Sequence, residues 1–186
     1  DNGVLISDRK FAGADTFATG KTVSAAIKKI LPDFDIILCG QFAIDGDTAQ
    51  TGPCIASLLN IPQVTYVKKI NEYSDGTITA TRLLDDGIES VKVKAPALLC
   101  ILKSESEPSR ALINGIIKAQ NTKITTLTLE DLGLNPEDVG IKGSPTYVSK
   151  AFRPEVKHTG EKHDCLETGT GAEIILNKIK EIGVLR

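Results

Sequence analysis

Two polar stretches, each directly after an apolar run, carry the side chains in this sequence best suited to binding a ligand. The first is CGQFAIDGDTAQTGP at 39–53, which follows the run DIIL. It is rich in glycine and in hydroxyl and amide groups, namely Gly40, Gly46, Gly52, Thr48, Gln50 and Thr51. Glycine lets the backbone approach a ligand closely, and the N-terminus of a following helix presents unpaired N–H groups that suit a phosphate.

This first stretch matches neither a Walker loop nor a GxGxxG motif, so the pattern of letters alone gives weak support. An ordinary glycine-rich turn with a helix cap is the alternative. Asp45 and Asp47 oppose binding of a bare phosphate, because like charges repel, but they could cap the helix or bond sugar hydroxyls. On the residues alone, both interpretations stay open.

The second stretch is FAGADTFATG at 11–20, which also follows an apolar run and also opens a helix. Asp15, Thr16 and Thr19 could cap that helix or bond a ligand. Ligands of open parallel sheets bind at the carboxyl ends of the strands. Two such loops at neighbouring strand ends therefore favour a nucleotide lying across the sheet edge.

The elements that would position these loops alternate along the chain. Strands are expected at 3–7, 35–40, 97–102 and 123–129, and helices at 16–30, from Pro53 to residue 60, near 110–120 and at 171–183. A meander of three strands is expected at 64–70, 77–84 and 88–94. The order predicts an α/β fold, with a mostly parallel, doubly wound, Rossmann-like sheet that carries a β-meander insertion.

Within the helix at 16–30, the apolar stripe expected to face the core consists of Phe17, Val23, Ala26, Ile27 and Ile30. A nucleotide-binding α/β domain is expected at 1–132. From 133 to 186 we expect an extended arm and a terminal helix that contact another protein, since periodicity is weak there. Tyr147 and Phe152 in the arm would be interface or packing residues.

Composition excludes several classes of function. The net charge is −2 with both signs interspersed, which gives no nucleic-acid footprint. No apolar run has the length of a membrane span. Cys39, Cys54, Cys100 and Cys165 lack metal-site spacing, and with His158 and His163 they predict reduced thiols, a cytoplasmic location and no metal centre.

Four segments in order resemble the β subunit of electron-transferring flavoproteins: DRKFAGADTFAT, CGQFAIDGDTAQTGP, SEPSRALINGIIKAQ and GIKGSPTYVSKAFRP. The resemblance spans essentially the whole chain, and it implies that the arm and terminal helix at 133–186 contact the α subunit of a heterodimer. In that family further strands and a CIKQVPD-type loop precede the region where this chain starts, so part of the pocket is expected to lie outside it. Residues 1–186 alone are accordingly not expected to form a stable monomer that retains flavin.

Intact FAGADTxAT and DGDTAQxGP motifs are similar to those of members that hold FAD in the β subunit and bifurcate electrons. The resemblance implies that NADH reduces this FAD, and that the electrons divide between FAD on the α subunit, with its partner dehydrogenase, and ferredoxin or flavodoxin. The alternative is structural AMP without redox chemistry; a regulatory adenine-nucleotide-binding domain is more distant. The implied cofactor-binding residues are Asp15, Thr16, Thr19, Gly40, Gln41, Phe42, Ala43, Ile44, Asp45, Gly46, Asp47, Thr48, Ala49, Gln50 and Thr51.

The segment SEPSRALINGIIKAQ corresponds to the family's recognition loop, which docks on an acyl-CoA dehydrogenase or a similar flavin dehydrogenase. Alignment through GIIKA places the apolar anchor at Ile113, with Leu112 as the neighbouring possibility. Burial in the helix core is the competing interpretation. Because adjacent helical residues face different sides, at least one of the two is expected to be buried.

Overall fold

The computed structural model describes residues 2–44, 46–103, 108–153, 160–165 and 169–184. The chain forms two compact units, residues 1–148 and residues 149–186. Asp45, His158 and parts of the expected arm, 154–159 and 166–168, lie outside the described residues.

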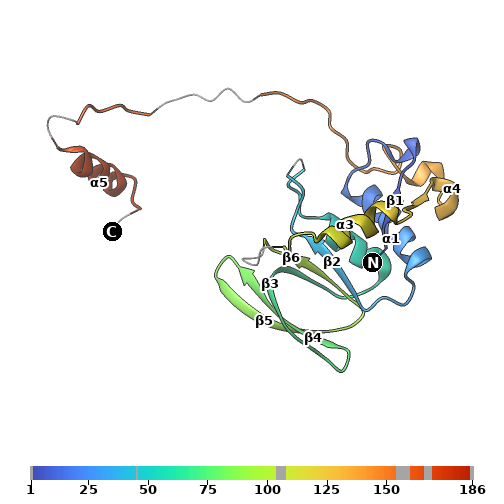
Figure 1. The fold of residues 1–186 in the computed structure, drawn as a ribbon. Helices are drawn as coiled ribbons and strands as arrows, with labels where there is room; N and C mark the ends of the chain where they lie inside the picture. The colour runs from blue at the N-terminus through green and yellow to red at the C-terminus, as the bar shows by residue number, and fades with distance from the viewer. Residues whose placement is uncertain (1, 45, 104–107, 154–159, 166–168, 185–186) are drawn as a thin grey trace. The chain divides into compact units, whose positions relative to one another are not determined.

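The first unit has an α/β fold, as predicted, built around a five-stranded sheet in the order β2-β6-β3-β4-β5 (Figure 1). Its strands are β2 (Ile36–Gly40), β3 (Gln63–Ser74), β4 (Thr77–Leu84), β5 (Gly87–Lys94) and β6 (Ala97–Ile101). β2, β6 and β3 run parallel, whereas β3, β4 and β5 form the antiparallel meander. The meander shares β3 with the parallel part, so it extends the same sheet.

A separate parallel pair consists of β1 (Val4–Ile6) and β7 (Thr125–Leu127). The helices are α1 (Thr16–Ile30), α2 (Thr51–Leu59), α3 (Ile113–Asn121), α4 (Leu129–Leu132) and α5 (Gly171–Glu181), with 3-10 turns at Arg9–Phe11 and Pro136–Asp138. α2 begins at Thr51, so Pro53 lies in its first turn, where the N–H that proline lacks is not needed.

Strand β6 lies between two apolar clusters. Leu98 and Cys100 pack with Ile55 and Ala56 of α2. Ala97 and Leu99 belong to the other cluster, which the meander closes with residues such as Ile78. A strand covered on both faces needs apolar residues at successive positions, which explains the unbroken run ALLCIL.

Helix α1 packs through small residues. Its buried positions are Ala18, Gly20, Thr22, Ser24 and Ala26. Gly20 lies so close to α2 that a Cβ would come within 3.0 Å of Cys54 Cβ. The expected stripe is therefore wrong at its two ends: Phe17 is 44% exposed and Ile30 37% exposed, because α1 turns its small-residue face toward the neighbouring helix.

The first unit continues to residue 148, past the boundary expected at 132. Val139 is 1% exposed, Lys21 of α1 pairs with Asp138 at 3.0 Å, and Ile141 N donates to Ala12 O at 3.1 Å. These contacts fix the segment after α4 onto the start of the chain. Its residues therefore belong to the α/β unit.

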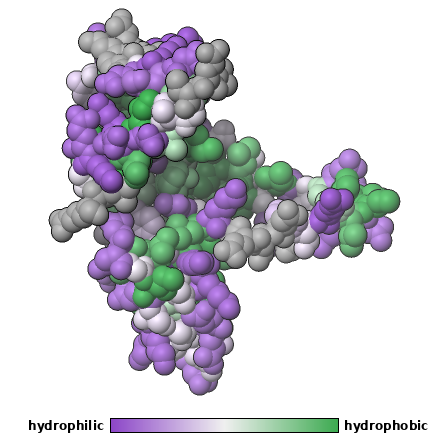
Figure 2. Space-filling view, turned by 90° about the vertical axis from the view of Figure 1, so that its left-hand side faces the viewer, coloured by the Kyte–Doolittle hydropathy of each residue, from purple (hydrophilic) through white to green (hydrophobic). Residues whose placement is uncertain are grey.

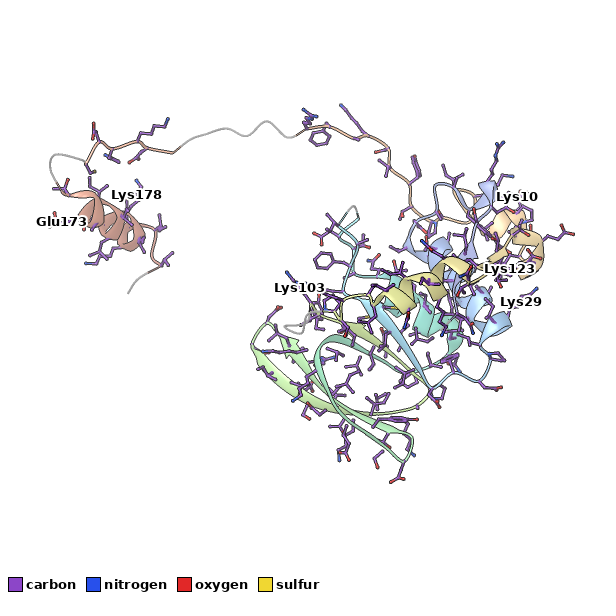
Figure 3. All side chains as sticks on the ribbon, in the orientation of Figure 1. Lys10, Lys29, Lys103, Lys123, Glu173 and Lys178 are labelled. Atoms are coloured by element: carbon purple, nitrogen blue, oxygen red, sulfur yellow. The ribbon has the colours of Figure 1, made fainter. Side chains whose placement is uncertain are left out.

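The second unit contains α5. Lys178, labelled with Glu173 in Figure 3, pairs with Glu161 at 3.3 Å and with Glu181 at 3.2 Å. Ile175 and Ile182 are exposed. In the described part of the chain, no helix combines the length and apolarity that crossing a membrane requires.

Candidate nucleotide site

The two polar loops meet in the structure. One loop follows β1 and opens α1, and the other follows β2 and opens α2. Thr16 Oγ1 donates to Gln50 Oε1 at 3.2 Å, which joins the first residue of α1 to the N-cap of α2. The contact between Gly20 and Cys54 holds the two helices side by side just beyond this bond. β1 and β2 belong to different sheets, so the loops are brought together by packed helices and not by neighbouring strands.

The loop from Gly40 to Gln50 has an unusual backbone. Gly46 N and Asp47 N donate to the carbonyl oxygen of Ala43 at 3.3 and 2.8 Å. Asp47 and Ala49 have φ angles of 46° and 54°, in the left-handed region that non-glycine residues seldom adopt. Such conformations cost free energy in non-glycine residues, and they cluster at active sites and ligand-binding loops as well as at helix ends and turns. A Cβ placed at Gly40 or Gly46 would meet no heavy atom of the described residues within 4 Å, so both positions are open among these residues.

Gly52 has a different role from the one expected for a loop glycine. It is buried in the first turn of α2, and a Cβ there would come within 2.6 Å of Cys100 Sγ and 3.4 Å of Leu98 Cδ2. Its lack of a side chain brings α2 close to β6. Glycine at this position serves packing of the helix on the sheet.

The starts of α1 and α2 differ electrostatically. Asp15 caps α1, because its Oδ1 accepts from Phe17 N and Ala18 N, both at 3.0 Å. Gln50 makes no side-chain cap bond at the start of α2. A carboxylate already offsets the positive end of α1, whereas the first-turn N–H groups of α2 remain suited to an external anion.

The other oxygen of Asp15 is also occupied. Oδ2 accepts from Thr146 N at 3.0 Å and from Thr146 Oγ1 at 2.8 Å. Desolvation would raise the pKa of this carboxyl, but the hydrogen bonds from Ala18, Thr146 and Phe17 outweigh it and lower the pKa below its ordinary value. The carboxylate therefore stays ionised at neutral pH, and its bonds are lost only as the pH falls through that lowered pKa. Of the two roles considered for Asp15, the structure shows the cap.

The remaining predicted site residues lie on or beside these loops. Thr19 is half-buried in the first turn of α1, where its N–H donates to Asp15 O at 2.9 Å. Phe42 is exposed, and Ile44 is 97% exposed near the loop tip. Sequence reasoning singled out no role for Ser144 or Thr146, although both lie in the GIKGSPT part of the fourth matching segment.

The predicted docking residues lie on the surface. Leu112 is 78% exposed and Ile113 76% exposed, and Ile116 and Ile117 are exposed as well. Figure 2, coloured by hydropathy, shows that apolar residues lie among polar ones on the face that it presents. The expectation that at least one of the adjacent pair is buried is wrong, because α3 buries none of its residues. Tyr147 and Phe152 are exposed too, without the local packing considered for them.

Two thiols lie side by side beneath the first turn of α2. Cys39 and Cys100 are register partners on the parallel strands β2 and β6. Desolvation, with a smaller contribution from Cys39, raises the pKa of Cys100 to about 11. The four cysteines are free thiols, and the described residues include no group of three or more His, Cys, Asp or Glu side chains placed to hold a metal ion.

Proteins of known family share much of this sequence. The electron transfer flavoprotein domain matches residues 1–132. The electron transfer flavoprotein subunit beta of Thermoanaerobacterium thermosaccharolyticum is 44% identical over 183 residues, which are 98% of this chain and 68% of that protein. The caffeyl-CoA reductase–Etf complex subunit CarD of Acetobacterium woodii is 41% identical over 97% of this chain and 68% of its own length.

A third relative is the acryloyl-CoA reductase electron transfer subunit gamma of Anaerotignum propionicum. It is 44% identical over 86% of this chain and 62% of its own length. The domain match covers most of the chain, and the Thermoanaerobacterium relative covers 98% of it. The chain therefore belongs to the electron transfer flavoprotein family, among its β subunits.

Proposed function

We propose that the loop 40–51 and the start of α1 bind a nucleotide, and that this nucleotide is FAD. The observation that carries the proposal is the hydrogen bond from Thr16 to Gln50, which joins two polar loops beside an α2 N-terminus without a side-chain cap. Such an N-terminus suits the phosphates. Open positions at Gly40 and Gly46 allow the ligand to reach the backbone.

Each side chain has a role in this proposal. Gln50 and Thr51 face the phosphate end at the start of α2, and Thr48 supplies a further hydroxyl. Asp45 and Asp47 bond ribose hydroxyls. Asp15 organises the start of α1, since its carboxylate is already occupied within the protein. Thr16 and Thr19 lie toward the flavin end, and bound FAD would supply hydride and single-electron chemistry.

The proposed activity is oxidation of NADH in a complex with the α subunit. The electrons divide, one part passing to FAD on the α subunit and its partner dehydrogenase, the other to ferredoxin or flavodoxin in the cytoplasm. The intact FAGADTFAT and DGDTAQTGP segments favour FAD. One relative is named as a subunit of a caffeyl-CoA reductase–Etf complex and another as electron transfer subunit gamma of acryloyl-CoA reductase, and these names support a role beside a reductase.

The alternative is a β subunit that holds AMP as a structural group and docks an acyl-CoA dehydrogenase. The same loops would bind its phosphate and ribose, so the geometry alone favours neither nucleotide. Release of the nucleotides on denaturing the αβ complex tests the choice. Two FAD for each heterodimer support the proposal, and one FAD with one AMP supports the alternative.

Replacement of Gly46 by valine should deplete the nucleotide of the β subunit. A Cβ at this position meets no heavy atom of the described protein within 4 Å, so the branched side chain obstructs the ligand and not the fold. We expect unchanged thermal melting and loss of most of the β-site nucleotide, measured by chromatography of denatured complex.

Gly160→Val is the matched control, because position 160 is equally open and lies in the second unit. It should leave the nucleotide content unchanged. Full occupancy of both nucleotide sites in the Gly46 variant would show that the loop is only a turn.

Replacement of Ile113 by alanine should weaken docking on the partner dehydrogenase without loss of nucleotide. The side chain is exposed at the start of α3, and loss of an apolar interface anchor typically costs about 2 kcal/mol or more of binding free energy. The measurement is the dissociation constant for the dehydrogenase, with the rate of electron delivery.

Ile88→Ala on β5 removes another exposed isoleucine, 66% against 76% for Ile113, from the meander and serves as control. It should bind the dehydrogenase like the unchanged protein. If the two isoleucine variants behave alike, the anchor lies elsewhere, and Leu112→Ala is the next variant to measure.

A further inference from the structure

The first turn of α1 is bonded to residues 144–146, which lie far away in the sequence. Thr146 donates its N–H and its hydroxyl to Asp15 Oδ2, at 3.0 and 2.8 Å. Asp15 N in turn donates to Ser144 Oγ at 2.8 Å. Three hydrogen bonds thus join Asp15 to two residues about 130 positions later in the chain.

This later segment is itself held in place. Ser144 Oγ donates to Gly140 O at 2.7 Å, and Ile141 N donates to Ala12 O at 3.1 Å. Gly140 has a φ of +58° and lies against the carbonyl oxygen of Lys10. Segment 139–146 is therefore fixed to the loop that precedes α1, so it can hold Asp15 in a defined place.

Asp15 and Thr16 are consecutive, but they contact different parts of the protein. Asp15 binds the 144–146 segment, and Thr16 binds Gln50 at the start of α2. Because Asp15 also caps α1, movement of its carboxylate would shift the first turn that carries Thr16. The contacts run without a break from Thr146 through Asp15 and Thr16 to Gln50.

We propose that Ser144 and Thr146 are positioning residues of the nucleotide site, which raise its affinity by holding Asp15 so that Thr16 meets Gln50. Neither residue needs to touch the nucleotide, since both polar groups of Thr146 bond Asp15. The inference rests on the proposed nucleotide site. It adds Ser144 and Thr146, which lie near the C-terminal end of the first unit, as residues that hold Asp15 in place.

The test uses the αβ complex after its β-site nucleotide has been removed, with FAD and AMP titrated separately by calorimetry. Thr146→Val removes the hydroxyl that bonds the carboxylate and keeps the shape of the side chain. A hydrogen bond to a charged group is among the stronger ones, so we expect about tenfold weaker nucleotide binding. Thr146→Ser, which restores the hydroxyl, should return the affinity to within about twofold of the original.

Thr128→Val is the matched control. Thr128 Oγ1 donates to Asp131 Oδ2 at 2.7 Å, an exposed hydroxyl–carboxylate bond at the start of α4. Loss of this bond should lower the melting temperature about as much as Thr146→Val does, and it should leave the dissociation constant for the nucleotide unchanged. A purely structural role of Thr146 predicts no difference in affinity between the two variants, and that result would overturn the inference.

A double variant tests whether Thr146 acts through Asp15. Asp15→Ala removes the carboxylate that accepts from Thr146, so the Thr146 hydroxyl then has no partner on residue 15. Adding Thr146→Val to it should weaken nucleotide binding no further, and additive losses would contradict the proposal. If Thr146→Val does not fold, Ser144→Ala should give about threefold weaker binding by loss of its bond to Asp15 N.

The same titrations separate this inference from the proposed function. Nucleotide binding with equal affinity in all variants overturns the positioning role and leaves the nucleotide site standing. Binding of neither FAD nor AMP by the unchanged complex overturns both.

Discussion

Replacement of Gly140 by alanine is expected to cause the largest loss of stability considered for this chain. Its φ of +58° disfavours any L side chain, and a Cβ would overlap the carbonyl oxygen of Lys10 and lie 3.1 Å from that of Ala12. Backbone atoms cannot rotate away as a side chain can. Left-handed strain and overpacking together cost about 3 kcal/mol or more of unfolding free energy. Urea unfolding of the complex measures the loss.

Gly133→Ala separates the two causes of this loss. Gly133 has nearly the same φ, +62°, at the end of α4, but a Cβ there would meet no heavy atom within 4 Å. It should lose only the conformational part, about 1 kcal/mol. Equal losses in the two variants would show that segment 139–146 does not pack closely on the loop before α1.

Replacement of Gly52 by alanine should combine lower stability with loss of the β-site nucleotide. The new Cβ would lie 2.6 Å from Cys100 Sγ, so α2 must move away from β6 or the thiol must shift. Overpacking of this kind costs about 1–3 kcal/mol. Displacement of α2 would also separate Gln50 from Thr16, and the affinity for the nucleotide should fall with the stability.

Two further variants check this account of Gly52. Gly115→Ala changes a helical glycine of α3 whose Cβ would have open space, so it should be neutral or stabilising. Cys100→Ala added to Gly52→Ala removes the obstructing sulfur and should recover part of the lost stability and nucleotide. If the second change makes the loss larger, contact with the thiol is not the cause.

Sequence patterns predicted the elements in which a single physical demand, such as burial on both faces or a tight turn, decides the residue types. The run ALLCIL reads as a buried strand because both faces of β6 are covered, and the Asp-Gly turns mark the meander. The polar loops were found because glycine, hydroxyl and amide groups follow strands. The two loops meet through Thr16 and Gln50, although the strands before them belong to different sheets and are not neighbours as expected.

Other features depend on contacts that no local pattern encodes. An aspartate that caps the helix and an aspartate that binds a ligand would look the same in the sequence. The bonds from Phe17 and Ala18 identify the cap, and the bond from Thr146, 131 positions later, shows that the second oxygen is also occupied. The inward face of α1 consists of alanine, glycine, serine and threonine, which a search for large apolar residues passes over. The exposure of Ile113 similarly depends on what surrounds α3 and not on its amphipathic pattern.

The reactivity of the Cys100 thiol, which lies beneath Gly52, can report how often α2 separates from the sheet. Cys100 is 3% exposed and its pKa is raised to about 11, so near neutral pH a thiol reagent can modify it only after α2 lifts from the sheet. Under conditions of rapid closing, the labelling rate measures the equilibrium constant for that opening, as amide hydrogen exchange does. A nucleotide that binds the closed start of α2 must slow labelling of Cys100 in proportion to its saturation. The labelling rate of this one cysteine, measured separately from those of the three more exposed thiols, could therefore rank nucleotides without an optical signal from a flavin.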